Sequence, residues 1–193
     1  MKLRVGVLAL QGAFREHRQA LEKLGCEVVE VRKPEEMNDI QGLIIPGGES
    51  TTMGKLLPNG LGDRIKELAK SNFPIFGTCA GMIILSKDIE DSDQYRLGLM
   101  DIKVRRNAFG RQVDSFEADI DISALGAKPV RAVFIRAPFV SEVKPNVGIL
   151  AEYADKIVFV RQGNMLASAF HPELTEDNRI HRYFLNIIEE WVK

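Results

Sequence analysis

Residues 77–81 of the chain have the spacing of a turn that carries a nucleophile. They read Gly-Thr-Cys-Ala-Gly and follow the apolar Ile75 and Phe76. In the Gly-x-Ser-x-Gly elbow, a strand turns sharply into a helix and exposes the central side chain, which here is the thiol of Cys79. Glycine suits the positions two residues before and two residues after the cysteine, because the turn is strained and crowded. The free N–H groups of the following helix favour the thiolate. The pattern predicts a nucleophilic Cys79; a buried structural cysteine, the simplest reading of Cys26, is the alternative.

A cysteine nucleophile usually needs a histidine that accepts its proton and later returns it to the leaving group. The chain has three histidines. We expect His17 to be packed in the first helix and His181 to lie on a solvated face of the last helix. His171 differs, because it follows the apolar run 165–170, at the point where a strand should leave the sheet.

The two residues after His171 support its selection as the base. Pro172 favours an extended backbone at the residue before it, and in an extended chain residues i and i+2 project to the same side. Glu173 can therefore hold one tautomer of the imidazole and stabilise the imidazolium. We predict a triad of Cys79, His171 and Glu173, with an exposed His-Pro-Glu turn as the alternative.

A Gly-Gly turn is a candidate for the groups that stabilise a negative oxygen. The apolar run 43–45 ends in Pro-Gly-Gly at residues 46–48. In an open parallel sheet, ligands bind beyond the carboxyl ends of the strands, where Cys79 must also lie. We expect the N–H groups of Gly48 and Ala80 to form an oxyanion hole, although a plain tight turn has the same residues.

The charged residues near these turns indicate a class of substrate. Acyl transfer through a thioester on Cys79 is the expected reaction. Glu49 suits an ammonium group, and Arg106 and Arg136, each at the end of an apolar run, are candidates for pairing with a carboxylate. Glutamine carries both groups and a side-chain amide. Both arginines are also consistent with ordinary surface positions.

The elements that must position these residues alternate in the first half of the chain. A nearly continuous apolar run, such as residues 3–10, is typical of a strand that is buried on both faces. Alternation of such strands with helices predicts a parallel sheet covered by helices on both sides. The expected strands are residues 3–10, 27–31, 43–45 and 75–76; the expected helices are residues 14–24, 61–70 and 80–86, with another capped by Ser50 or Thr51.

From about residue 97 the pattern changes to short strands, several of which alternate apolar and polar residues. Such alternation favours antiparallel pairing. A final helix is expected after Thr175. We therefore expect a single α/β domain over residues 1–193, with three layers, a mostly parallel central sheet flanked by helices, and an antiparallel β extension. The short strands expected are residues 99–104, 115–120, 132–136, 147–153, 157–161 and 165–170.

Composition narrows the classes of function. The chain has 193 residues, 45% hydrophobic and 27% charged, with a formal net charge of −1. This is typical of a soluble globular protein, and we expect neither a nucleic-acid partner nor a membrane partner. Two cysteines and an N-terminus without the layout of a signal peptide indicate a reducing, cytoplasmic location.

Residues 46–48, 77–81 and 171–173 together resemble the class I, triad-type glutamine amidotransferase family. Longer strings are similar to the glutaminase subunits of pyridoxal 5′-phosphate synthase, and the resemblance extends from Lys2 to the terminal helix. These strings are residues 6–12 with 16–17, 46–53, 106–112 with 115–117, 134–138 and 170–175.

The resemblance implies a class I amidotransferase-like, flavodoxin-like fold that needs no cofactor or metal. The chain would hydrolyse L-glutamine to L-glutamate and ammonia, and pass the ammonia to a (β/α)₈-barrel synthase subunit within a large hetero-oligomer. Gln11 would lie near the oxyanion region and the partner surface. By the same matching, glutamine would be contacted by Gly47, Gly48, Glu49, Arg106, Ile135 (through its backbone) and Arg136.

Three other functions remain open. The chain could serve a different amidotransferase, for example in anthranilate, histidine or purine synthesis. The same fold also occurs in redox- or stress-sensing proteins with an oxidisable elbow cysteine, although such proteins do not need Glu173 beside His171. A regulatory subunit that binds glutamine without cleaving it is the third alternative.

Overall fold

The computed structural model describes residues 2–107 and 115–193, and most of their strands belong to one mixed sheet. Its first half is parallel throughout, as the alternating sequence pattern predicts. The strand at its centre is buried on both faces, so its residues are almost all apolar. In spatial order, this half consists of β2 (Glu27–Val31), β1 (Arg4–Leu8), β3 (Gly42–Ile45), β4 (Ile75–Thr78) and β12 (Met165–Ser168).

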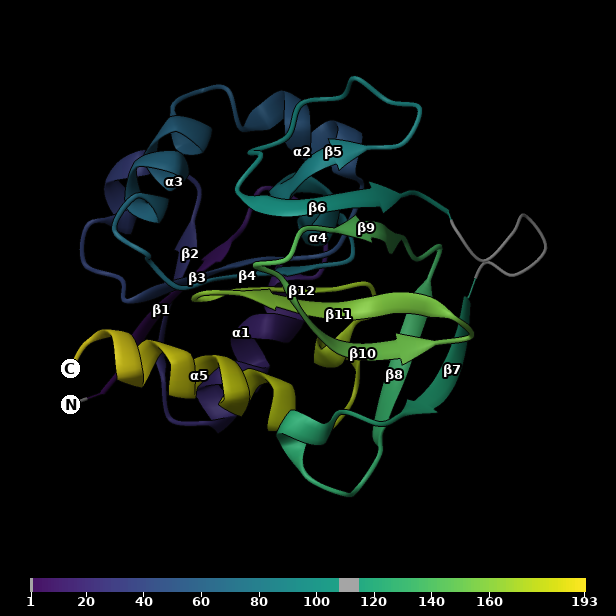
Figure 1. The fold of residues 1–193 in the computed structure, drawn as a ribbon. Coiled ribbons are helices and arrows are strands. Elements are labelled where there is room, and N and C mark those ends of the chain that lie inside the picture. The colour runs from purple at the N-terminus through teal and green to yellow at the C-terminus, as the bar shows by residue number, and fades with distance from the viewer. Residues whose placement is uncertain (1, 108–114) are drawn as a thin grey trace.

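Helices cover both faces of the sheet and give the three layers expected (Figure 1). On one face lie α1 (Phe14–Lys23) and α5 (Arg179–Trp191). On the other lie α2 (Ser50–Leu56), α3 (Leu61–Ala69) and α4 (Ala80–Leu85). Aromatic rings fill the layer beneath α5, where the ring centroids of Phe76 and Phe184 are 5.6 Å apart. The fold class is therefore the predicted one.

The second half of the sheet is mixed, and two of its strands were not predicted. Antiparallel pairs join β12 to β11, β11 to β9 and β9 to β6, but β6 pairs with β5 in parallel. The two unpredicted strands, β5 and β9, are short and include exposed polar residues, so their hydrophobic patterns are weak. The strands of this half are β11 (Lys156–Gln162), β9 (Phe139–Val143), β6 (Met100–Arg105) and β5 (Ser86–Ile89), with β10 (Gly148–Tyr153) paired to β11.

A separate two-stranded sheet lies beside β10. β7 (Ser115–Ile120) and β8 (Val130–Ile135) are antiparallel, with Arg131 on β8 paired across to Asp119 at 3.3 Å. The backbone N–H of His171 donates to the carbonyl oxygen of Val133 on β8 at 2.8 Å. The pair therefore supports the segment that follows β12. The described residues also form three short 3-10 helices: η1 (Pro34–Met37), η2 (Ser123–Leu125) and η3 (Pro172–Leu174).

Two helix starts differ from the sequence prediction. Glu49, and neither Ser50 nor Thr51, caps α2, because its side chain accepts from the backbone N–H groups of Thr51 and Thr52 in the first turn. The final helix begins at Arg179 and not directly after Thr175, because residues 172–174 form η3 first. Both differences arise from local hydrogen bonds that compete with helix propensity.

Parallel pairing of β4 with β12 places the two expected catalytic segments together. The paired residues run from Ile75 with Met165 to Thr78 with Ser168. One further hydrogen bond extends the ladder into the turn, from the N–H of Cys79 to the carbonyl oxygen of Ser168 at 2.7 Å. Because both strands end at the same edge, the residues that follow them become neighbours.

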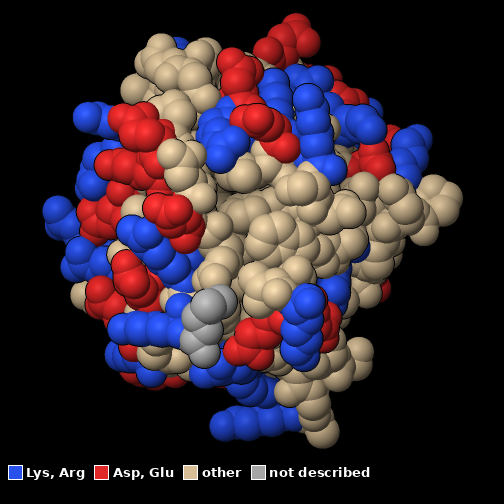
Figure 2. All heavy atoms as spheres, turned by 90° about the vertical axis from the view of Figure 1, so that its left-hand side faces the viewer, with Lys and Arg blue, Asp and Glu red and all other residues tan. Residues whose placement is uncertain are grey.

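Charges of both signs are mixed on the face shown in Figure 2, which is the left-hand side of Figure 1. Lysine and arginine side chains lie among aspartate and glutamate side chains, around an area that carries no charge. The longest helix in residues 2–107 and 115–193 is α5, with 13 residues, whereas a membrane crossing takes roughly 20. No helix of this part of the chain is long and apolar enough to span a membrane.

The crowding at the elbow yields a test of the fold. A Cβ at Gly81 would overlap the carbonyl oxygen of Ile45, so Gly81→Ala should lower the free energy of unfolding by about 1–3 kcal/mol. At Gly148 the nearest atom to a Cβ is 3.7 Å away, so Gly148→Ala should leave stability within about 0.5 kcal/mol of the parent. Urea denaturation measures both; equal stabilities would contradict the packing described.

Candidate active site

Cys79 lies in a strained backbone conformation between β4 and α4. Its φ is 51° and its ψ is −102°, a backbone conformation that residues other than glycine rarely adopt. A Cβ at Gly77 would lie 2.6 Å from the carbonyl carbon of Gly81, so both flanking glycines are required by space, as the sequence pattern predicts. The turn leaves Cys79 7% exposed, and its sulfur lies 3.8 Å from the carbonyl oxygen of Ile135.

His171 and Glu173 form a short, buried hydrogen bond. Nδ1 of His171 is 2.6 Å from Oε1 of Glu173, and the two side chains are 8% and 0% exposed. Burial disfavours the imidazolium, but hydrogen bonds and charge interactions with Cys79 and Glu173 outweigh it and raise the pKa of His171 to about 10. Burial likewise opposes ionisation of Glu173, yet the neighbouring His17 and His171 keep the pKa of its carboxyl below the usual value.

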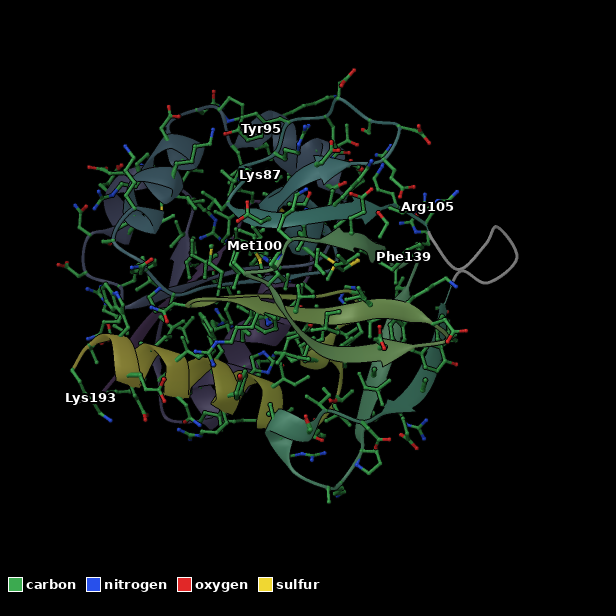
Figure 3. The ribbon with its side chains drawn as sticks, in the orientation of Figure 1. Lys87, Tyr95, Met100, Arg105, Phe139 and Lys193 are labelled. Carbon is green, nitrogen blue, oxygen red and sulfur yellow. The ribbon has the colours of Figure 1, made fainter. Side chains whose placement is uncertain are left out.

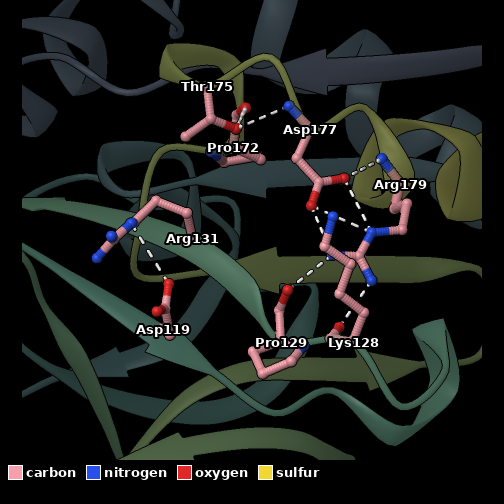
Figure 4. Close-up of polar contacts among 8 residues, drawn as sticks. All are labelled: Asp119, Lys128, Pro129, Arg131, Pro172, Thr175, Asp177 and Arg179. Carbon is pink, nitrogen blue, oxygen red and sulfur yellow. Dashed lines mark hydrogen bonds and ion pairs between the residues drawn. The ribbon is translucent and has the colours of Figure 1, made fainter.

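The segment that carries His171 and Glu173 is anchored at its far end by Arg179 (Figure 4). The guanidinium of Arg179 pairs with Asp177 at 2.6 Å and donates to the carbonyl oxygens of Lys128 and Pro129 at 2.7 and 2.8 Å. Three strong acceptors therefore hold this arginine. The contacts tie the chain between η3 and α5 to the loop before β8.

A pocket of about 240 Å³ opens beside the sulfur of Cys79. Residues from five separated parts of the chain meet at it. Two of its non-glycine residues besides Cys79 also have positive φ, Asn107 at 48° and Arg136 at 43°, and strain of this kind gathers at functional sites. The pocket is lined by Gly48, Glu49, Ser50, Cys79, Ala80, Ile83, Arg106, Asn107, Ile135, Arg136 and His171.

The Gly47-Gly48 turn lies against the predicted triad and is held by the loop after β1. A Cβ at Gly47 would overlap Cε1 of His171 and lie 3.3 Å from Cβ of Cys79. Gly47 therefore sits beneath the pair and is not among the residues that line the pocket. Its carbonyl oxygen accepts from Ala13 N–H at 3.2 Å. The side-chain oxygen of Gln11 accepts from Glu49 N–H at 3.0 Å.

Glu49 is held in its charged form at the pocket. Hydrogen bonds lower the pKa of its carboxyl to about 2; the largest contribution comes from the Thr52 hydroxyl and others from the N–H groups of Thr52 and Thr51. Oε2 accepts from both the hydroxyl and the N–H of Thr52 at 2.7 Å. Capping α2 thus keeps a negative charge at the rim, where a cation can still approach.

The two arginines reach the pocket from different strands. Arg106 follows β6, whose last residue Arg105 lies beside Phe139 at the start of β9 (Figure 3). The guanidinium of Arg106 donates to Oε1 of Gln94 at 2.8 Å. Arg136 follows β8. Residues 108–112, the remainder of the string that begins at Arg106, lie outside the described residues.

Sequence reasoning missed three residues near the site. Gln94 lies in a polar loop without a pattern, and its role in holding Arg106 has no sequence signal. His17 is fully buried, as expected for a packed histidine, but its ring faces Glu173 at 3.4 Å. The expectation that His181 is solvated was wrong: its exposed fraction is 0%, because the buried face of α5 is wide enough to include it beside Phe184.

Comparison with known structures supports the fold. A crystal structure of a glutamine amidotransferase is 51% identical, with a TM-score of 0.91, and the match covers 96% of this chain and 98% of that one. A glutamine amidotransferase from Thermotoga maritima has a TM-score of 0.64 at 12% identity, covering 98% of this chain and 85% of that one. The second match shows the fold alone.

Comparison of sequences identifies the family. A protein named "Pyridoxal 5′-phosphate synthase subunit PdxT" from Carboxydothermus hydrogenoformans is 62% identical over 184 residues, which are 95% of this chain and 96% of that one. The protein of the same name from Moorella thermoacetica is 59% identical over 187 residues, 96% of this chain and 100% of that one. The family model described as "SNO glutamine amidotransferase family" matches residues 7–190. The chain therefore belongs to the SNO glutamine amidotransferase family.

Proposed function

We propose that this chain hydrolyses L-glutamine to L-glutamate and ammonia, and supplies the ammonia to a synthase subunit that makes pyridoxal 5′-phosphate. The observation that supports the hydrolysis most directly is the buried His171–Glu173 hydrogen bond of 2.6 Å at the edge of the pocket that contains Cys79. The names and high identity of the relatives support the product.

In the first half of the reaction, the sulfur of Cys79 attacks the side-chain amide carbon of glutamine. His171 takes the thiol proton, and Glu173 stabilises the resulting imidazolium. The amide oxygen becomes negative and is stabilised by the N–H groups of Gly48 and Ala80. When the tetrahedral intermediate collapses, the C–N bond breaks, His171 returns the proton to the nitrogen, and ammonia leaves.

In the second half, water cleaves the thioester. His171 accepts a proton from the water as its oxygen attacks the thioester carbon, and Cys79 leaves as the sulfur recovers its proton. The products are glutamate and the original thiol, so the sum is glutamine plus water to glutamate plus ammonia. No cofactor is needed for either half.

The pocket rim suits the two charged groups on the α-carbon of glutamine. The Glu49 carboxylate would pair with the α-ammonium, and the guanidinium groups of Arg106 and Arg136 with the α-carboxylate. Ile135 would contribute its backbone carbonyl, and Gly47 would act by leaving room for His171. Because both charged groups belong to the same end of the substrate, holding them at the rim directs the neutral amide end to Cys79.

We infer that the synthase is a (β/α)₈ barrel that docks beside Gln11, within a large cytoplasmic hetero-oligomer. Gln11 contacts two adjacent residues at the rim: its side-chain oxygen holds the Glu49 backbone, and its amide lies against Gly48. A partner that moves Gln11 would therefore adjust the oxyanion donor of Gly48. Both thiols are free, which suits a reducing compartment.

The defining experiment uses the chain mixed with the synthase. Cys79→Ala should reduce glutamine-dependent pyridoxal 5′-phosphate formation by at least about 10³-fold, while the rate with added ammonium salt stays at the parent level. An unchanged glutamine-dependent rate would instead favour a binding subunit. A parent chain that hydrolyses glutamine but supports only a different synthase would indicate another amidotransferase.

The His171–Glu173 bond leads to a second expectation. Glu173→Gln should lower kcat by about 10²- to 10⁴-fold with little change in KM, because the negative charge that stabilises the imidazolium is lost. Without that charge the pKa of His171 falls from about 10, so the alkaline limb of the kcat/KM profile should move to lower pH. The exposed Glu176 is the control: Glu176→Gln should retain the parent profile. An unshifted limb in Glu173→Gln would contradict the assignment.

The charge of Glu49 leads to a third expectation. Glu49→Gln keeps an acceptor for the α2 cap but removes the negative charge, so KM for glutamine should rise about 10- to 100-fold while kcat changes less than about threefold. Steady-state kinetics at pH 7 measures this. Glu67→Gln, on the exposed face of α3, should leave KM unchanged; an equal KM in both variants would remove Glu49 from the binding site.

A further inference from the structure

The buried face of α1 brings His17 against the back of the His171–Glu173 pair. Nε2 of His17 is 3.4 Å from Oε2 of Glu173 and 3.1 Å from the hydroxyl of Thr78, the residue before Cys79. Nδ1, on the other side of the ring, is 2.9 Å from Nε2 of His181 on α5. His17 is fully buried and does not line the pocket, so it can act only through its neighbours.

Glu173 needs a donor at the place where His17 lies. Oε1 is hydrogen-bonded to His171, whereas Oε2 is buried and has no conventional hydrogen-bond partner in the described part of the chain. A carboxylate oxygen without a partner in the interior carries a large cost. The ring nitrogen at 3.4 Å therefore matters: an N–H there attracts Oε2, and a lone pair repels it.

The hydrogen-bond pattern selects one tautomer of each buried ring. With hydrogen on Nε2, His17 points an N–H between Glu173 and Thr78, and its Nδ1 accepts from Nε2–H of His181. Of the four nitrogens in these two described rings, only Nδ1 of His181 then keeps an unpaired lone pair. With hydrogen on Nδ1 of His17 instead, the Nε2 lone pair of His17 would face the Glu173 carboxylate. Nε2 of His181 would then have to accept, so the N–H of His181 would be on its Nδ1, which has no acceptor. The carboxylate therefore favours hydrogen on Nε2 of His17.

The electrostatic surroundings keep both rings neutral. Burial lowers the pKa of His17, with His171 acting in the same direction, and Glu173 and Glu16 opposing it. Burial also lowers the pKa of His181 to about 3, helped by His17 and opposed by Glu173. A neutral N–H donor on Oε2 holds the carboxylate without neutralising it, so its charge remains available to His171.

We propose that His17 is a positioning residue for the glutaminase reaction: its Nε2–H orients the Glu173 carboxylate, and His181 fixes the tautomer that makes this possible. The proposal rests on the proposed function for its kinetic consequence and on the buried geometry alone for its structural part. It also gives the two histidines outside the predicted triad a shared task.

Two substitutions at one position separate this role from simple packing. The amide nitrogen of glutamine can take the place of Nε2, whereas that of asparagine reaches only the place of Nδ1. In the complex with the synthase, His17→Gln should stay within about threefold of the parent kcat. His17→Asn should lose about 10-fold or more in kcat with KM changed less than twofold. The acidic limb of the pH profile of His17→Asn should move to higher pH, because the Glu173 carboxylate loses a donor and protonates more readily.

The pH profile and thermal unfolding distinguish the outcomes. If both variants lose activity and stability equally, with the parent's pH profile, His17 is only a packing residue and the proposal is overturned. Equal, parent-like activity in both variants overturns it as well.

A measurement on the parent chain tests the structural part even where a variant fails to fold. Nitrogen-15 NMR of labelled histidines should show a neutral, Nε2-protonated His17 at pH 7, and an Nδ1-protonated or charged ring would overturn the proposal. If the parent does not hydrolyse glutamine, the proposed function fails, and the NMR result still decides the tautomer.

Discussion

The site depends on one constraint, the parallel pairing of β4 with β12. Parallel neighbours end at the same edge of a sheet, so the turn after one strand meets the segment after the other. The hydrogen bond from Cys79 N–H to the Ser168 carbonyl carries the ladder to the edge itself. All of β4, and all of β12 except the half-buried Met165, is buried, so packing on both faces of the sheet holds the two strands in register. The separation of Cys79 and His171 is therefore set by the core.

Burial makes the paired charges of the site depend on each other. An isolated imidazolium or carboxylate would lose its charge in these surroundings, but His171 and Glu173 stabilise one another at 2.6 Å. The strained turn at Cys79 is held in a similar way, by packing that glycine at positions 77 and 81 makes possible. In both cases an unfavourable local state persists because the surrounding structure allows no alternative.

Much of this arrangement was predictable because its signals are local. Turn glycines, a proline and the i, i+2 geometry of extended chain are properties of a few adjacent residues, and they were enough to select residues 77–81 and 171–173. Elements with strong hydrophobic patterns were also predicted from the sequence, and β2 and β7 have the predicted bounds. Short edge strands such as β5 escaped prediction because half of their residues are solvated and polar. The Glu49 cap escaped it because a serine and a threonine follow directly.

By itself, the sequence determined the types of reactive groups and the strand ends at which they lie, because both follow from patterns in a few consecutive residues. Tertiary structure alone decided what surrounds those groups. His181 follows Arg179 and precedes Arg182, which locally indicates a solvated face, yet it is buried against His17. Gln94 belongs to no pattern, yet it holds Arg106. The physical reason is that a side chain's polar partners depend on which helices and loops pack behind it, and that packing is settled between segments far apart in the chain.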